Sequence, residues 1–273
     1  MENLKHKHWA IISIGILVAI FVILAIWFAW RAKTAEAPTQ NTASSTQAVI
    51  AQPLHITEHA AYYDIDLTYP SATPFAESNP AANATAIAAM KKFTEDSVTQ
   101  FKKDGDFANL TAEDIKMIGF SADRKYALSS EYKLYTGART VSYSFLVYED
   151  TLGAHPNSYY KTFTFDTQTG EYIDDIYKLF RQETDVEGLL SVRTRLDLPR
   201  IITNMNNGDA SFVDSDYINE GTARGNNFTS FYIEGKNLVI VFPPYQVGPY
   251  ALGTVLDPIP LAQIGDSLKS QYR

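Results

Sequence analysis

The sequence predicts an α+β fold, an antiparallel sheet with flanking helices, preceded by one N-terminal transmembrane helix. Three observations lead to this prediction. Most of the 17 Tyr and 15 Phe residues fall in segments where apolar and polar residues alternate, as in half-buried strands. Runs with helical spacing lie between some of these segments, without the regular strand–helix alternation of parallel α/β folds. Residues 9–30 hold no charged residue and are long enough to cross a bilayer.

The N-terminal part is interpreted as a signal anchor. Residues 1–8 form a cytoplasmic leader, residues 9–30 the membrane span, and residues 31–54 a flexible tether rich in Thr, Ala, Ser, Gln and Pro. A cleaved signal peptide has an apolar region of only about 7–15 residues, so a retained anchor is favoured, while cleavage after Ala35–Ala37 stays open. We therefore expect a single-pass protein of the cell membrane, with a cytoplasmic N-terminus and residues 55–273 as the extracytoplasmic domain.

The composition narrows the classes of function. The chain has no cysteine, which excludes disulfides and cysteine-based metal sites. Its formal net charge is −8, and it becomes −9 when the segment through Trp30 is removed. A domain this acidic is a poor candidate for nucleic-acid binding and a better one for a basic protein partner, although solubility alone would also explain the charge. No nucleic-acid partner and no cofactor are expected.

The folded part is expected to contain strands and helices in a mixed order. These are a strand at 63–69, helices at 80–105 and 111–116, strands at 126–135, 141–148 and 159–165, helices at 172–180 and 186–198, a polar surface loop at 204–227, and a last helix at 260–268. Asn79 followed by Pro80 is a helix-start signal. Pro199 is expected to end the helix that begins at residue 186.

Residues 231–242 are predicted to form a hairpin that closes the sheet. Alternation in the first strand is followed by a polar turn and by an unbroken apolar run, which is typical of a strand covered on both faces. Pro243 and Pro244 end this strand, because neither can donate to a ladder. The aromatic loop that follows, with Tyr245 and Tyr250, holds no nucleophile or metal-ligand set. This loop favours a binding or structural module.

The residues His55–His59 match the letters H-x-x-E-H of a zinc-protease motif. That motif needs a helix, which places both imidazoles on one face. Here the letters run straight into an alternating strand, and on a strand positions four apart are separated by about 13 Å, too far to share a zinc ion. An exposed strand entry is the favoured interpretation.

Two groups of acidic residues could also bind a metal ion or take part in acid–base chemistry. Asp214, Asp216, Asn219 and Glu220 offer oxygen ligands, but the glycine and spacing of a calcium-binding EF-hand are absent, so a solvated loop is favoured. Asp174–Asp175 lie at the start of an expected helix, where carboxylates favour the helix dipole. No metal-binding residue is assigned.

His155 is the only histidine of the domain beyond the pair at its start, so a Ser-His-Asp site would have to use it. It lies in a loop between two expected strands, where functional residues often occur, but a structural hydrogen-bonding role is favoured. Tyr245 and Tyr250, if exposed, would suit stacking on sugar faces, although packing in the core or the hairpin is the favoured interpretation. We therefore predict His155, Asn157, Tyr245 and Tyr250 as ligand-binding residues and no catalytic residue.

Two stretches, taken together and in this order, resemble a known family. The first joins Gly153–Asn157, Phe163–Gly170 and Ile176–Phe180, and the second is Val241–Gly253. They are similar to the extracytoplasmic domain of RsiV-like anti-sigma factors, which are lysozyme receptors, and to the N-terminal region of PdaC-type peptidoglycan deacetylases, a pair of domains of unknown function. The resemblance covers roughly residues 55–268. It implies an α+β fold outside the membrane of a bacterium, with binding rather than catalysis.

The expected function departs from that of both kinds of relative. Met1–His8 is too short to hold a sigma factor, and no deacetylase domain precedes Arg273, so neither activity is expected to carry over. The leading hypothesis is a membrane-anchored, non-catalytic module that binds a cell-envelope ligand, either a lysozyme-like basic protein or peptidoglycan. The alternatives are a cell-wall-acting enzyme or accessory domain that uses His155, and a structural envelope protein.

Overall fold

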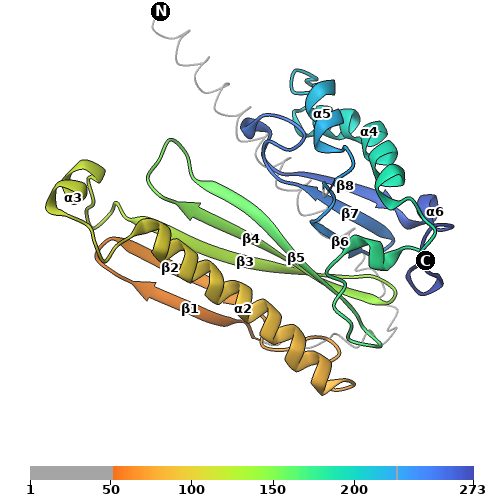
Figure 1. The fold of residues 1–273 in the computed structure, drawn as a ribbon, viewed down its shortest axis with the longest axis horizontal. Coiled ribbons are helices and arrows are strands. Elements are labelled where there is room, and N and C mark those ends of the chain that lie inside the picture. The colour runs from red at the N-terminus through yellow and green to blue at the C-terminus, as the bar shows by residue number, and fades with distance from the viewer. Residues whose placement is uncertain (1–51, 226) are drawn as a thin grey trace, which may run out of the picture. The chain divides into compact units, whose positions relative to one another are not determined.

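The computed structural model describes residues 52–225 and 227–273, all within one compact unit, Ala48–Arg273. Two sheets with helices make up this part of the chain (Figure 1). The predicted leader, the predicted membrane span and all but the end of the predicted tether lie outside the described residues. Among the described residues, no helix combines the length and the apolar character needed to cross a bilayer.

The first sheet has five strands in the order of the sequence. They are β1 (Leu54–His59), β2 (Tyr63–Tyr69), β3 (Tyr126–Thr136), β4 (Thr140–Asp150) and β5 (Asn157–Asp166). Three of the four pairings are antiparallel, but β2 and β3 run parallel. The prediction of an antiparallel sheet is therefore wrong at this pair. The chain between β2 and β3 contains a long helix, and a helical crossover is what returns a chain to start a parallel neighbour.

That crossover helix, α2 (Pro80–Gly105), has the predicted bounds. The Asn79 side chain caps it by accepting a hydrogen bond from the Ala82 amide at 3.1 Å. Its apolar face packs on one face of the five-stranded sheet, where Met90 and Phe145 are both fully buried (Figure 1). A short helix, α3 (Ala112–Ile118), follows as predicted.

The predicted hairpin is present but belongs to a second sheet. This sheet is antiparallel and contains β6 (Phe231–Glu234), β7 (Asn237–Phe242) and β8 (Val255–Pro260). Strand β8 is absent from the sequence prediction because Pro258 and Pro260 weaken its strand signal, yet an edge strand tolerates proline. The last helix predicted at 260–268 is only the single turn α6 (Leu261–Ile264).

The helix predicted to stop at Pro199 continues through it. Helix α4 (Val186–Met205) carries Pro199 in its interior, and Leu198 and Ile202 on either side are fully buried. Thr203 also donates a hydrogen bond from its hydroxyl to the Pro199 carbonyl oxygen at 2.8 Å. Packing of the apolar face therefore offsets the hydrogen bond that proline removes.

Two further segments differ from the prediction. The helix expected at 172–180 is only a 3₁₀ turn, η1 (Ile176–Leu179), with Asp175 as its cap. The loop expected at 204–227 contains a short helix, α5 (Ser215–Gly221). Two more 3₁₀ turns are η2 (Tyr250–Leu252) and η3 (Ser270–Tyr272).

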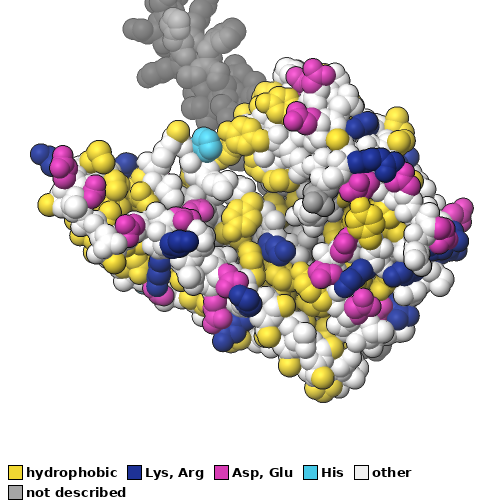
Figure 2. All heavy atoms as spheres, viewed as in Figure 1, with side chains coloured by type: hydrophobic (Ala, Val, Ile, Leu, Met, Phe, Trp, Pro, Cys, Tyr) yellow, Lys and Arg dark blue, Asp and Glu magenta, His cyan; other side chains and the backbone are white. Residues whose placement is uncertain are grey.

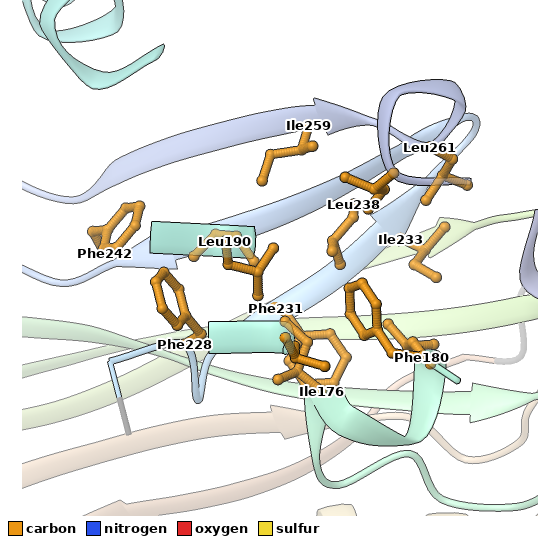
Figure 3. Close-up of a cluster of buried hydrophobic side chains, with 14 of the residues drawn as sticks. Ile176, Phe180, Leu190, Phe228, Phe231, Ile233, Leu238, Phe242, Ile259 and Leu261 are labelled. Atoms are coloured by element: carbon orange, nitrogen blue, oxygen red, sulfur yellow. The ribbon is translucent and has the colours of Figure 1, made fainter. Parts of the chain in front are cut away.

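The largest hydrophobic cluster lies on one face of the three-stranded sheet (Figure 3). Phe231 and Leu238 from the hairpin meet Ile176 and Phe180 from the η1 region and Leu190 from α4. All five side chains are at most 4% exposed. This cluster holds the C-terminal half of the described chain together.

Two backbone amides on the free edge of β6 donate hydrogen bonds to side chains instead of to a further strand. The Phe231 amide donates to the Thr162 hydroxyl and the Ile233 amide to the Ser142 hydroxyl, both at 3.2 Å. Ser142 and Thr162 lie on the face of the five-stranded sheet opposite α2. The edge amides of the second sheet are thus satisfied by hydroxyls of the first.

Candidate functional site

Three of the four predicted binding residues come together in one aromatic stack. The His155 ring lies 3.8 Å from the Tyr250 ring, centroid to centroid, at an interplanar angle of 24°. Tyr245 lies 5.5 Å from Tyr250 on the same measure. We call His155, Tyr245 and Tyr250 the aromatic platform. His155 is exposed and the Tyr245 side chain is 58% exposed, so the platform presents ring faces to solvent.

The platform joins two loops that are distant in the sequence. The Tyr250 hydroxyl donates to the Pro156 carbonyl oxygen, which ties the loop after β7 to the loop before β5. Nδ1 of His155 lies 3.0 Å from the same oxygen. Because a carbonyl oxygen only accepts hydrogen bonds, Nδ1 carries the proton in this contact and Nε2 is left as the acceptor.

The loop that carries Tyr245 and Tyr250 is fixed from behind. The Gln246 side chain donates two hydrogen bonds of 2.8 Å, to the carbonyl oxygens of Gly221 and Asn227. Val247 is 1% exposed, and a Cβ at Gly221 would collide with the Gln246 carbonyl. Helix α5 therefore holds the loop through a close backbone approach that glycine allows.

Backbone strain accompanies both loops of the platform. Leu152 has φ of 58° and Tyr245 has φ of 71°, in the left-handed region that side chains with a Cβ rarely adopt. Each such residue costs on the order of 1 kcal/mol, and such strain concentrates at functional sites. The surrounding contacts thus hold Tyr245 in an unfavourable conformation that leaves its ring exposed.

Asn157 borders the platform without being one of its rings, and the histidine motif lies on another strand. Asn157 opens β5 with an exposed side chain, next to the Pro156 carbonyl that Tyr250 binds. His55 and His59 lie on an extended strand rather than a helix, as predicted, but this is the separate strand β1, which is antiparallel to β2. Each imidazole faces a different carboxylate, His55 that of Asp66 and His59 that of Asp64. The H-x-x-E-H letters therefore do not form the helical arrangement of a zinc protease.

The residues that could have served as calcium ligands have structural roles. Asp214 caps α5 and accepts from the Asp216 amide at 2.8 Å. The Asn219 carbonyl oxygen accepts from Arg195 at 2.9 Å. In the described parts of the chain, no group of three or more His, Asp or Glu side chains is placed to hold a metal ion.

A cavity of about 260 Å³ was not predicted from the sequence. Its floor contains Ile176 and Phe228, both 4% exposed, and its other lining residues include the carboxylates of Asp174, Asp175 and Glu187. Asp174 forms an ion pair of 2.8 Å with Lys178, which lowers the pKa of this carboxyl below its usual value. Asp174 and Asp175 directly precede η1 and Glu187 lies on α4, so only the folded chain brings these carboxylates together. We call this site the carboxylate-rimmed cavity.

Residues 168–262 match a family model described as "Protein of unknown function (DUF3298)". This range includes Tyr245, Tyr250 and the whole carboxylate-rimmed cavity, but not His155. The match does not name an activity.

The chain is also related to a curated protein, peptidoglycan-N-acetylmuramic acid deacetylase PdaC of Bacillus subtilis (strain 168). The two are 30% identical over 194 residues, which is 70% of this chain and 38% of PdaC. The chain thus matches well under half the length of that relative. The match confirms the PdaC part of the resemblance read from the sequence, while the similarity to RsiV-like anti-sigma factors stays a prediction.

Two solved structures share the fold. A member of the DUF3298 family from Bacteroides fragilis aligns with a TM-score of 0.52 at 19% identity and covers 81% of this chain and 93% of that one. A DUF3298 family protein from Pseudomonas aeruginosa aligns with a TM-score of 0.50 at 13% identity and covers 81% and 94%. Both support an α+β fold with a mixed five-stranded sheet.

Proposed function

We propose that this chain, whose residues 168–262 match the DUF3298 family, is a membrane-anchored extracytoplasmic module that binds peptidoglycan without cleaving it. The observation that carries the proposal is the aromatic platform. His155 and Tyr245 are exposed, His155 stacks on the half-buried Tyr250, and the loop that carries both tyrosines is fixed by hydrogen bonds and buried neighbours.

Such a platform suits a glycan strand. A sugar ring presents a face of C–H groups to an aromatic ring while its hydroxyls stay in water, so aromatic faces gain contact without burying polar groups. A surface that is rigid before binding loses little conformational freedom when the ligand arrives. The relative PdaC, a peptidoglycan deacetylase, is consistent with a module directed to the cell wall.

The contacts of His155 favour binding over catalysis. In the described residues its partners are the Tyr250 ring and the Pro156 carbonyl, and no carboxylate or hydroxyl nucleophile bonds to it. A general base needs a partner that orients it and a group from which it takes a proton. The alternative of a wall-acting enzyme that uses His155 therefore has less support.

The proposed location follows from the sequence. An anchor at residues 9–30 would hold the module at the outer face of the membrane, and a coil of about 20 residues would give it a reach of roughly 25 Å.

The proposal is tested by sedimentation of the full chain, purified in detergent, with insoluble sacculi. Tyr245→Gly removes one ring and relieves the positive φ, so we expect an unchanged or higher melting temperature but about twofold to tenfold weaker binding. Tyr245→Phe keeps the ring and should bind like the native chain. Tyr217→Ala, which removes a 40% exposed tyrosine on α5, is the matched control.

A second candidate, capture of a lysozyme-like basic protein, is favoured by the carboxylate-rimmed cavity and the net charge of −9 beyond Trp30. Complementary charge raises the rate at which two proteins meet, and salt screens this attraction. Asp174→Asn with Glu187→Gln should weaken binding of lysozyme to the full chain severalfold at low salt, while Glu77→Gln on the exposed surface should not. Titration that shows no saturable, salt-sensitive binding would remove this candidate.

A further inference from the structure

A second, smaller cavity lies between the two sheets. It has a volume of about 80 Å³, and its lining includes Tyr135, Ser144, Leu146, Tyr160, Tyr232 and Leu256. These residues come from β3, β4 and β5 of the first sheet and from β6 and β8 of the second. A cavity of this size is large enough for a small group of a few heavy atoms. We call it the inter-sheet cavity.

Its walls combine leucine and tyrosine side chains with polar groups. The rings of Tyr135 and Tyr232 are stacked, with centroids 4.3 Å apart and an interplanar angle of 16°. Tyr232 is 3% exposed, whereas Leu256 is 36% exposed, so the cavity has a buried side and a side near solvent. Glu131 and Lys133 also line it.

One buried hydroxyl in this cavity has no hydrogen-bond partner among the described residues. It is Oγ of Ser144, in a residue that is 4% exposed. The hydroxyls beside it on the same sheet face are bonded: Ser142 contacts Thr164 at 2.9 Å, and Thr162 accepts from the Phe231 amide. Buried polar groups are normally satisfied, so an unpaired hydroxyl in a cavity wall points to a ligand group.

The inter-sheet cavity and the aromatic platform lie along the same strand. Tyr160 lines the cavity, and Pro156, just before the first residue of β5, accepts the hydrogen bond from Tyr250. Positions 156 and 160 share a face of a strand and are separated by about 13 Å. A single ligand that contacts both places must therefore be longer than one sugar ring.

We propose that the inter-sheet cavity takes the acetamido group of an N-acetylated sugar within a glycan whose neighbouring unit stacks on the aromatic platform. The Ser144 hydroxyl donates to the acetamido carbonyl, and the leucine and tyrosine walls surround the methyl group. A sugar hydroxyl would satisfy Ser144 but would leave the leucine and tyrosine side chains without an apolar partner. An ammonium group would likewise leave these side chains without an apolar partner, and the opposite charges of Glu131 and Lys133 in the lining give it no net advantage. This inference deepens the proposed function and rests on it.

The test compares two β-1,4-linked trimers, of N-acetylglucosamine and of glucosamine, by calorimetric titration of the full chain. High salt in both titrations suppresses general attraction between the acidic chain and the cationic trimer. The native chain should bind the acetylated trimer at least tenfold more tightly, because the acetyl group supplies both a hydrogen-bond acceptor and a buried methyl.

Ser144→Ala should reduce this preference by about threefold to tenfold. The variant is expected to fold, since it removes a hydroxyl that no described residue satisfies. Thr140→Ala is the matched control, because the Thr140 hydroxyl is also buried and unpaired among the described residues but does not line the cavity. Its preference should equal that of the native chain.

Equal affinity for the two trimers, or an unchanged preference in Ser144→Ala, would overturn this inference. In either case retention of the native chain on sacculi would leave the proposed function standing. A chain that binds neither trimer nor sacculi would overturn both.

Discussion

The carboxyl group of Asp257 is the most unusual titratable group in the described chain. The residue is fully buried on β8, and neither carboxyl oxygen has a hydrogen-bond partner among the described residues. Burial, with the nearby carboxylate of Asp197, raises its pKa to about 7, against the opposing influence of Arg193 and Arg200 on α4. The folded state therefore binds a proton at Asp257 more tightly than the unfolded chain does.

Asp257→Asn should change the pH dependence of stability. The folded pKa of Asp257 is about 7 and the unfolded value 3.8, so its full contribution to stability is present below about pH 4 and is lost as pH rises towards 7. Asparagine does not ionise, and the variant should be more stable than the native chain at pH 8 by roughly 1–3 kcal/mol. Urea unfolding at pH 4, 6 and 8 measures the difference.

The control for this prediction is Asp266→Asn, at an exposed position near the C-terminus. It should leave the pH profile unchanged. A difference between native chain and Asp257→Asn that stays constant from pH 4 to pH 8 would contradict the assignment.

The residues of the aromatic platform were only partly predictable from the sequence. His155 was predictable as a candidate because it is the only histidine of the domain beyond the pair at its start, and Tyr245 and Tyr250 because they lie in a stiff aromatic loop. Their stacking was not, since it depends on two loops that meet only after the sheets form. Neither the positive φ of Tyr245 nor the unpaired hydroxyl of Ser144 leaves a trace in residue type or spacing.

At the scale of the structural element, the position of the loop after β7 depends on the Gln246 side chain. Gln246→Ala would leave the carbonyl oxygens of Gly221 and Asn227 without the two hydrogen bonds that they now accept. We expect a loss of about 1–3 kcal/mol in the free energy of unfolding, and faster amide hydrogen exchange in residues 245–250. Sacculus binding should fall even though every platform ring is retained.

Gln263→Ala provides the comparison, since Gln263 is exposed on α6. Hydrogen exchange measured by mass spectrometry should show no change in the loop for this variant. Unaltered exchange in Gln246→Ala as well would mean that other contacts, such as the buried Val247, hold the loop alone.

Elements with strong local signals were predictable, and those set by tertiary contacts were not. The bounds of α2 follow from its Asn79–Pro80 start and its apolar spacing. Helix α4 continues past Pro199 because burial of its apolar face outweighs the lost hydrogen bond. The parallel pairing of β2 with β3 could not be predicted from local signals. It arises from one strand–helix–strand unit, whereas the other pairings between the described strands are antiparallel.

At the scale of the whole molecule, charged side chains of both signs and hydrophobic side chains are interspersed over the face shown in Figure 2. One group of hydrophobic side chains lies beside a histidine near the upper edge of that face. A net acidic charge spread in this way keeps a protein soluble, and specific contact is left to local sites. Such a mixed surface adds no specific support for a basic protein, and peptidoglycan is placed first because of the aromatic platform.

The central claim is that the chain holds peptidoglycan and leaves it intact. One measurement tests it most directly: sedimentation of the full chain with purified sacculi, with soluble wall fragments and free acetate measured in the same supernatant. The account predicts that the chain is found in the pellet and that the supernatant holds neither product above the level of a protein-free control. A chain that stays in the supernatant, or the release of fragments or acetate, would contradict it.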